Sequence, residues 1–280
     1  MQDWEVIIND LDNATDLSVD AFIGRLDAIS KQMYEEIVQM ASSLNYEATT
    51  SAQMVENLKT LNKINSKIGS LLQKTDYKEA TTDFIKSFEK SQRFINLYYS
   101  TIVTGFEPSQ DLFKTMLKAN VETTSEMLIG SGIDANFNEP IKRLLQDVIN
   151  GRGSYMNMKQ SLSNYILGNK NISPRLKSYV GQVASDSVRQ FQRNYMNAIS
   201  SDLGLKHYLY RGTAITDTRK FCSDRVGRVF TETEVKSWAS TSWKGKASGT
   251  NSSTIFTYVG GYNCRHTLLP ISENIYNSKI

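Results

Sequence analysis

The sequence is poor in cysteine, histidine and proline, and it contains no long hydrophobic run. Two cysteines in 280 residues cannot form a disulfide framework, which favours a protein made and kept in a reducing cytoplasm. No apolar run approaches the roughly 20 residues that a membrane span needs. The N-terminus lacks a basic segment followed by an apolar one, so nothing there indicates a secretory signal. No proline precedes Pro108, and the helices before it are therefore free to be long.

What the chain does contain is typical of a globular protein with an uneven charge distribution. Hydrophobic residues make up 40%, charged residues 22% and aromatic residues 10%, a composition that a disordered chain would not have. The net charge is only +3, but residues 1–104 are acidic and residues 204–280 are basic. A basic C-terminal segment permits contact with nucleic acid or an acidic protein surface, and a solvated basic face is the alternative.

Residues 1–104 carry three runs of apolar residues at steps of three and four, the spacing of amphipathic helices. The runs cover residues 22–44, 55–71 and 84–102. Asp16 or Ser18 is the expected N-cap of the first, and the second has a spacing close to a coiled-coil seam. The third is rich in aromatic residues, for which core packing is favoured over a docking surface. This segment is expected to form an antiparallel helical bundle or a coiled-coil arm.

Residues 105–204 are expected to form a helical lead-in to the C-terminal segment. Pro108 breaks the preceding helix because a proline disfavours helix in the residue before it. Further helices are predicted over residues 112–128, 141–149, 155–167 and from Ser173, the expected cap of a helix that starts with Pro174. On this last helix Arg189 and Arg193 are four residues apart and share a face. They could hold a phosphate, and the alternative is a solvated or ion-paired arrangement.

Residues 205–280 have the sequence pattern of a small α+β domain. His207–Arg211 and Arg228–Thr231 are candidate strands, and Glu232–Trp238 is expected to form a helical turn capped by Thr231 or Thr233. The predicted fold is therefore mainly α, with an N-terminal helical bundle or long helices and a small C-terminal α+β domain.

The rest of this segment is predicted as a loop, a strand and a tail. Ser240–Ser253 is polar and longer than most loops in compact domains, which indicates a functional or partner-ordered element. Thr254–Val259 is the strongest predicted strand in the protein. The residues after Pro270 are expected to form a short tail.

Cys222, Cys264 and His266 are the one cluster of soft metal ligands. Cys264 and His266 could supply two zinc ligands from one turn and Cys222 a third, with Asp224 or His207 completing a tetrahedral site. Structural zinc sites, however, usually present paired cysteine knuckles, and this chain has only two cysteines. The favoured interpretation is a metal-free cluster in the core, and no cofactor is expected.

An enzymatic use of Cys264 and His266 is the second possibility that the residues raise. Two residues apart on a strand, they would point to the same face, and a thiol activated by an imidazole is a nucleophile. No oxyanion turn or recognisable nucleophile motif accompanies them, so no catalytic residue is assigned. Asp217 and Arg219 are better interpreted as a local turn in which the carboxylate caps backbone N–H groups. Arg211, Arg219 and Arg265 are expected to pair with Asp217, Asp224 or carbonyls inside the small domain.

The order and spacing of these residues resemble the C-terminal signature of tailed-phage minor head proteins, the phage Mu F-like head morphogenesis family. In this sequence the pattern appears as an Asp-x-Arg-x-x-Cys turn at Asp217, a Gly-Arg-Val-Phe strand at Gly227, and a closing Gly-Gly-Tyr-Asn-Cys-Arg-His before Pro270. The matching positions, called the signature residues below, are Tyr210, Arg211, Gly212, Asp217, Arg219, Cys222, Gly227, Gly261, Asn263, Cys264, Arg265 and His266.

The resemblance implies a non-enzymatic minor capsid protein that acts at the portal vertex during head morphogenesis. Its implied partners are the portal protein, other head or neck proteins and genomic DNA, with multiple copies in the virion and no membrane association. It implies localisation in the capsid interior or at the portal vertex, after synthesis in the host cytoplasm. The residues considered for contact with DNA or portal are Arg189, Arg193, Lys244 and Lys246. The alternative function is a small Cys/His-dependent enzyme or toxin-like domain on a helical stalk, with Cys264, His266 and Arg211 as its site.

Overall fold

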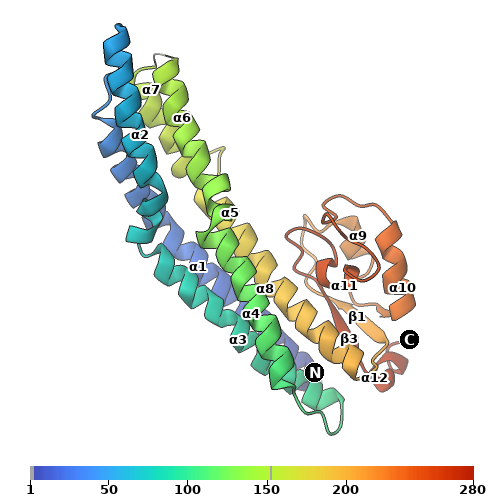
Figure 1. Cartoon of the computed structure of the whole chain (residues 1–280). Helices are drawn as coiled ribbons and strands as arrows, with labels where there is room; N and C mark the ends of the chain where they lie inside the picture. Colours follow the sequence, from blue (N-terminus) through green and yellow to red (C-terminus); the bar gives the residue numbers. More distant parts are fainter. Residues whose placement is uncertain (1–2, 152) are drawn as a thin grey trace. The chain divides into compact units, whose positions relative to one another are not determined.

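Helices dominate the structure, a computed structural model that describes residues 3–151 and 153–280 (Figure 1). The helices are α1 (Asp3–Ala41), α2 (Ser51–Lys74), α3 (Tyr77–Ile102), α4 (Gln110–Ile129), α5 (Ser131–Ile133), α6 (Glu139–Asn150), α7 (Tyr155–Ile166), α8 (Arg175–Asp202), α9 (Lys220–Ser223), α10 (Glu232–Ser237), α11 (Ile255–Tyr258) and α12 (Glu273–Asn277). A π-helical turn, η1 (Asp134–Asn138), precedes α6, and a 3-10 turn, η2 (Trp238–Ser240), follows α10. The strands are β1 (His207–Arg211), β2 (Val229–Thr231) and β3 (Thr267–Ile271). The predicted fold class, mainly α with a small C-terminal α+β region, is confirmed.

The chain divides into two compact units, each built from separate segments of the sequence. The sheet-bearing unit comprises Met1–Leu17, Lys86–Asn120 and Ser185–Ile280, and the helical unit comprises Ser18–Ile85 and Val121–Ala184. Helices α1, α3, α4 and α8 therefore contribute residues to both units. Neither unit coincides with the segments 1–104, 105–204 and 205–280 into which the sequence was divided.

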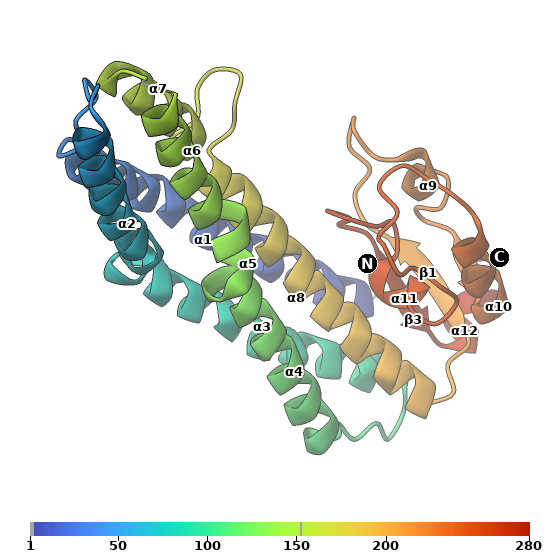
Figure 2. The same cartoon turned by 45° about the horizontal axis from the view of Figure 1, so that its top comes forward.

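The helical unit is held by apolar stripes that face one another. Phe22 of α1 stacks on Phe84 of α3 with ring centroids 5.3 Å apart. The hydroxyl of the buried Tyr77 donates to the Leu128 carbonyl at 2.8 Å and so ties α3 to α4. Within the same unit α6 contacts both α2 and α7 (Figure 2). Pro140 lies in the first turn of α6, as predicted, where its missing N–H costs no helical hydrogen bond.

The helical part of the sheet-bearing unit is organised around α8. Phe191 of α8 meets Phe88 of α3 edge to face, with ring centroids 5.1 Å apart. The buried side chain of Gln192 donates to the hydroxyls of Thr15 on α1 and Ser91 on α3, at 2.6 and 2.9 Å. Because a buried amide is costly unless it is hydrogen-bonded, Gln192 fixes the relative register of these three helix segments.

The sheet is antiparallel with the strand order β2-β1-β3. The central strand β1 pairs Leu209 with Val229 on one side and with Leu269 on the other. A core of buried residues that includes Tyr210, Phe221 and Trp238 packs beside it. Thr231 caps α10, and with Glu234 it forms a reciprocal capping box, as the sequence predicted.

The start of α1 differs from the prediction. The helix begins at Asp3, so Asp16 and Ser18 lie inside it rather than at its N-cap. The buried residues Trp4, Ile8 and Leu11 continue the apolar stripe of α1 toward the N-terminus, and this pattern outweighs the local capping preference. Similarly, α8 begins at Arg175, one residue after Pro174.

Two predictions for the last thirty residues were wrong. The predicted strand Thr254–Val259 forms the helical turn α11, because the Asn251 side chain accepts hydrogen bonds from the N–H groups of Ser253 and Thr254 and starts a tight turn. The predicted tail after Pro270 is ordered as the end of β3, followed by α12. Pro270 fits β3 because it is an edge strand of the sheet.

Among the described residues, no helix is both long enough and apolar enough to cross a bilayer.

Candidate functional site

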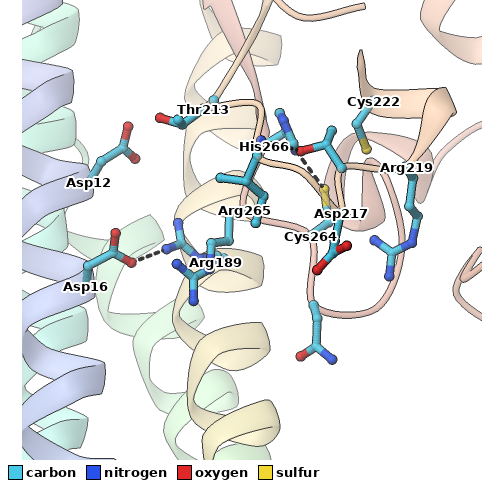
Figure 3. Close-up of a pocket in the computed structure, with 14 residues that line it drawn as sticks. Asp12, Asp16, Arg189, Thr213, Asp217, Arg219, Cys222, Cys264, Arg265 and His266 are labelled. Atoms are coloured by element: carbon cyan, nitrogen blue, oxygen red, sulfur yellow. Dashed lines mark hydrogen bonds and ion pairs between the residues drawn. The ribbon is translucent and has the colours of Figure 1, made fainter. Parts of the chain in front are cut away.

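The signature residues gather around a cavity of about 310 Å³ in the sheet-bearing unit (Figure 3). Its walls come from α1, α8, the segment that follows β1, α9 and the loop that precedes β3. The lining residues are Asp12, Asp16, Arg189, Gly212, Thr213, Ile215, Asp217, Thr218, Arg219, Cys222, Asn263, Cys264, Arg265 and His266. Eight of the twelve signature residues are in this set, so the fold brings most of the predicted positions together.

Two helices supply an ion pair between a buried arginine and a half-exposed aspartate that line the cavity. Arg189 of α8 is 4% exposed and donates to the carboxylate of Asp16 on α1 at 2.5 Å. Burial lowers the pKa of Arg189, and the neighbouring Asp16 opposes that effect. Burial likewise raises the pKa of Asp12, while the charge of Arg211 lowers it. The ion-paired alternative for Arg189 is therefore confirmed.

Arg193 has a structural position rather than a surface one. Its side chain is 4% exposed, and it donates to three main-chain carbonyls: Thr257 at 3.1 Å, Cys264 at 2.5 Å and His266 at 2.7 Å. Contact of this guanidinium with DNA or a portal surface, as considered from the sequence, is excluded in this conformation because the fold already surrounds it. Arg193 instead connects α11 and residues 259–266, called the signature loop below, to α8.

Two arginines of the signature, Arg211 and Arg219, also bind within the fold, but Arg211 does so with α1 and not with Asp217, Asp224 or a carbonyl of residues 205–280. Arg211 donates to Asp12 at 3.1 Å and to Asn9, both on α1, and it lines two neighbouring cavities. Arg219 donates to the Tyr262 carbonyl at 2.6 Å, as the prediction of a carbonyl partner required. Arg211, which the alternative enzymatic function groups with Cys264 and His266, is hydrogen-bonded to α1.

Two charged residues of the cavity remain exposed. Within residues 3–151 and 153–280, neither Asp217 nor Arg265 has a hydrogen bond or ion pair. The turn before α9 is closed by Thr218, whose hydroxyl accepts from the Ile215 N–H at 2.7 Å. The expected capping role of the Asp217 carboxylate was therefore wrong, because the neighbouring hydroxyl takes it. Asp217 and Arg265 are the cavity charges that are free to meet a partner.

The remaining predicted residues shape the loops. Gly261 has φ +96°, and a Cβ there would lie 1.9 Å from the Gly245 carbonyl oxygen, so only glycine fits. The Asn263 N–H donates to Asp186 on α8 at 2.9 Å. Of the two lysines, Lys244 is exposed, whereas Lys246 donates to the Ala239 and Thr241 carbonyls at 2.6 and 2.8 Å. Tyr210 is fully buried, Gly212 packs against His266, and Gly227 donates to the Tyr210 carbonyl.

The cluster of Cys222, Cys264 and His266 is buried at one side of the cavity. Both thiols are free, and the two sulfurs and one imidazole nitrogen all lie within 4.8 Å of one another. The Sγ atom of Cys264 is 3.7 Å from Nδ1 of His266. The hydrogen bond between the thiols raises the pKa of Cys222 and lowers that of Cys264. Asp224 pairs with Lys220 and His207 stacks on Tyr276, so neither completes this cluster as a fourth ligand.

Sequence reasoning missed the contribution of α1 to the site. Asp12 and Asp16 are four residues apart, which places them on one face of a helix, and this was the available signal. Their partners are Arg211 and Arg189, more than 170 residues away in the chain, and spacing alone cannot indicate such pairs.

No protein-family model, no curated protein and no solved structure matches this chain.

Proposed function

We propose that this chain is a minor capsid or head morphogenesis protein of a tailed bacteriophage, a non-enzymatic virion component that binds the portal vertex. The proposal starts from the order and spacing of the signature residues. The single observation that carries the proposal is the set of contacts that those residues make in the structure. Four of them, Arg211, Asn263, Cys264 and His266, hold the C-terminal region against α1 and α8, and that is the role expected of a structural component.

Three helices bind the signature region within the sheet-bearing unit. Arg193 of α8 holds the carbonyls of Cys264 and His266. On α3, the Tyr98 hydroxyl donates to the Pro270 carbonyl, and on α1, Asp12 accepts from Arg211 at 3.1 Å. Groups committed to buried hydrogen bonds position the backbone and are not free to act on a substrate. This arrangement is consistent with a C-terminal region that is held rigidly on the helices and acts as a structural part of the virion.

The exposed charges supply the proposed contact surface. Lys244 and Arg265 are exposed, and residues 204–280 carry an excess of basic over acidic side chains. Such a surface favours an acidic portal face or the DNA backbone. Lys244 is retained from the four residues considered from the sequence, and Arg265 is added. Arg189 and Arg193 are set aside because they are buried, and Lys246 because it donates to two main-chain carbonyls.

The direct test is co-purification of the full chain with the portal protein encoded in the same genome, followed by native mass spectrometry. A discrete complex of defined stoichiometry is the expected result. The double variant Lys244→Glu/Arg265→Glu should weaken that complex without unfolding the chain. Lys114→Glu is the matched control, since Lys114 is also exposed in the sheet-bearing unit but lies on α4. A chain that stays monomeric in the presence of folded portal protein would overturn the proposal.

The alternatives make different predictions in the same preparations. Direct DNA binding predicts an affinity that falls steeply as salt rises. An enzyme predicts that His266→Asn abolishes a catalytic rate while the unfolding midpoint is retained.

A further inference from the structure

We infer that Cys222, Cys264 and His266 bind one divalent zinc ion, which staples the turn of α9 to the signature loop. This inference goes beyond the proposed function and does not depend on it. It also reverses the metal-free interpretation that the sequence favoured. The chain lacks paired cysteine knuckles, but the fold brings three metal-ligating side chains together from separate parts of the sequence.

The ligand geometry is close to that of a zinc site. Zinc binds sulfur at about 2.3 Å and imidazole nitrogen at about 2.0–2.1 Å, so neighbouring ligand atoms of a tetrahedral site lie roughly 3.5–3.8 Å apart. The 3.7 Å between Cys264 Sγ and His266 Nδ1 is within that range. All three ligand atoms lie within 4.8 Å of one another, and a shift of about 1 Å suffices to complete the triangle.

The surroundings suit a metal with two thiolate ligands. All three side chains are buried, with Cys222 1% and Cys264 2% exposed, where an uncompensated charge would be costly. Two thiolates and a neutral imidazole balance the charge of a divalent ion, and the thiol protons leave to solvent. Thiolate ligands select soft or borderline metals. Zinc is one of these, and because it has no geometric preference from its d-electrons, it can accept the arrangement of these three ligand atoms.

Two buried polar atoms lie beside the cluster: the hydroxyl of Tyr210, which interacts with the Cys222 thiol, and Nε2 of His266, which has no partner among the described residues. A Cβ placed on Gly260 would meet Cys222 Sγ at 2.4 Å, Cys264 Sγ at 2.7 Å and the Tyr210 hydroxyl at 3.4 Å. The hydroxyl therefore lies near both sulfurs and can donate to a thiolate ligand. Such outer partners orient metal ligands and adjust their basicity.

The backbone around the sulfurs is held in an unusual conformation. Val259, a buried β-branched residue, has φ +48°, and Asn263 has φ +55°. A strained non-glycine residue persists only where the surrounding structure requires it. Here the strain brings the main chain of Gly260 against both thiols, which closes the cluster on that side.

The opposite side of the cluster opens on the cavity described above, since all three ligands line it. Three protein ligands leave one tetrahedral position, and a water molecule from the cavity can occupy it. The cavity also gives the ion a path of entry. Figure 3 shows the three side chains converging from α9 and from the loop before β3.

The test uses the full-length chain, purified without chelator, with metal content measured by plasma mass spectrometry. One zinc per chain is expected. Cys264→Ser and His266→Asn should lower the zinc content at least tenfold, whereas His207→Asn should leave it unchanged. His207 is the matched control because it is the other histidine of the chain and stacks on Tyr276 instead. Zinc retained in Cys264→Ser, or lost equally in His207→Asn, would overturn the inference.

A second measurement keeps the test valid if these variants unfold. Wild-type chain is stripped with a chelator, reloaded with Co²⁺ alone and examined by absorption spectroscopy. A thiolate-to-cobalt charge-transfer band together with the intense visible bands of a tetrahedral ion is the expected spectrum. Its absence from chain that circular dichroism shows to be folded would refute the site. Because the portal protein plays no part in either measurement, this result is independent of the assembly test.

Discussion

At the scale of single residues, the position of the signature loop depends on Arg193. Its guanidinium donates to the main-chain carbonyls of Thr257, Cys264 and His266. Replacing it by Met retains most of the apolar stem but leaves buried acceptors unsatisfied, at about 1–3 kcal/mol each. We expect Arg193→Met to lower the unfolding free energy of the sheet-bearing unit by at least about 3 kcal/mol, measured by urea denaturation with tryptophan fluorescence.

A matched substitution separates this effect from the loss of any arginine. Arg228 also donates to a main-chain carbonyl, that of Asp224 at 3.2 Å, but it is exposed. Arg228→Met should therefore cost less than about 1 kcal/mol. Equal decreases in unfolding free energy for Arg193→Met and Arg228→Met would show that the buried hydrogen bonds of Arg193 contribute no more than one exposed hydrogen bond. Arg193→Lys should fall between them, because an ammonium lacks the planar fork that reaches several acceptors.

The two arginines of α8 also show the limit of sequence reasoning at this scale. Spacing correctly placed Arg189 and Arg193 on one helix face. It could not reveal that the face is buried, since their partners are an aspartate on α1 and carbonyls of the C-terminal loop. The order of the signature residues could be recognised in the sequence. That the main-chain carbonyls of two of them accept hydrogen bonds from Arg193 could not be predicted, because every residue type has a main-chain carbonyl.

At the scale of elements, the capping box of α10 offers a sharp test. The Thr231 hydroxyl accepts from the Glu234 N–H at 3.3 Å, and Glu234 accepts from the Thr231 N–H at 2.7 Å. Thr231→Ala should cost about 0.5–2 kcal/mol in urea denaturation. Thr233→Ala, the other cap considered from the sequence, should be nearly neutral because Thr233 is exposed inside the helix. The opposite ranking would assign the cap to Thr233.

The same capping box has a pH dependence with a definite sign. Hydrogen bonds from the main-chain N–H and the hydroxyl of Thr231 lower the pKa of Glu234 from its ordinary value of 4.5. The stabilisation is therefore fully present above pH 4.5 and is lost as the pH falls through the lowered folded-state value. The stability difference between wild type and Thr231→Ala should shrink across that acidic range.

The errors at this scale have a common cause. Thr254–Val259 has the composition of a strand, yet an asparagine three residues upstream starts a turn and the segment becomes α11. Conversely, β3 was hidden because Pro270 suggests the end of a structured segment, although proline is tolerated on an edge strand. Periodicity indicated the long helices well, because a repeated apolar stripe is little affected by a single exception. Alternation also correctly predicted β1, but the short elements α11 and β3 were not predicted.

At the scale of the whole molecule, the C-terminal region is one part of a unit that also contains the first residues of the chain. Trp4, Ile8 and Leu11 of α1 are buried in the sheet-bearing unit, and Asp12 and Asp16 bind Arg211 and Arg189. Burial of each apolar side chain contributes about 1.5–3 kcal/mol. Removing residues 1–17 therefore deletes several buried side chains and leaves two guanidinium groups without their carboxylates.

We expect this deletion to expose the sheet, although it lies near the other end of the sequence. Hydrogen exchange followed by mass spectrometry should show the amides of β1 and β3 losing protection by more than about 100-fold. Deleting residues 272–280 is the control, because α12 contains no buried residue and its loss should affect mainly the stacking partner His207. If the sheet kept its protection without residues 1–17, residues 205–280 would be an autonomous domain, as the sequence division implied. If protection is lost, the signature functions only within a unit that three distant segments build together, and any transfer of the signature to another protein must carry those helices with it.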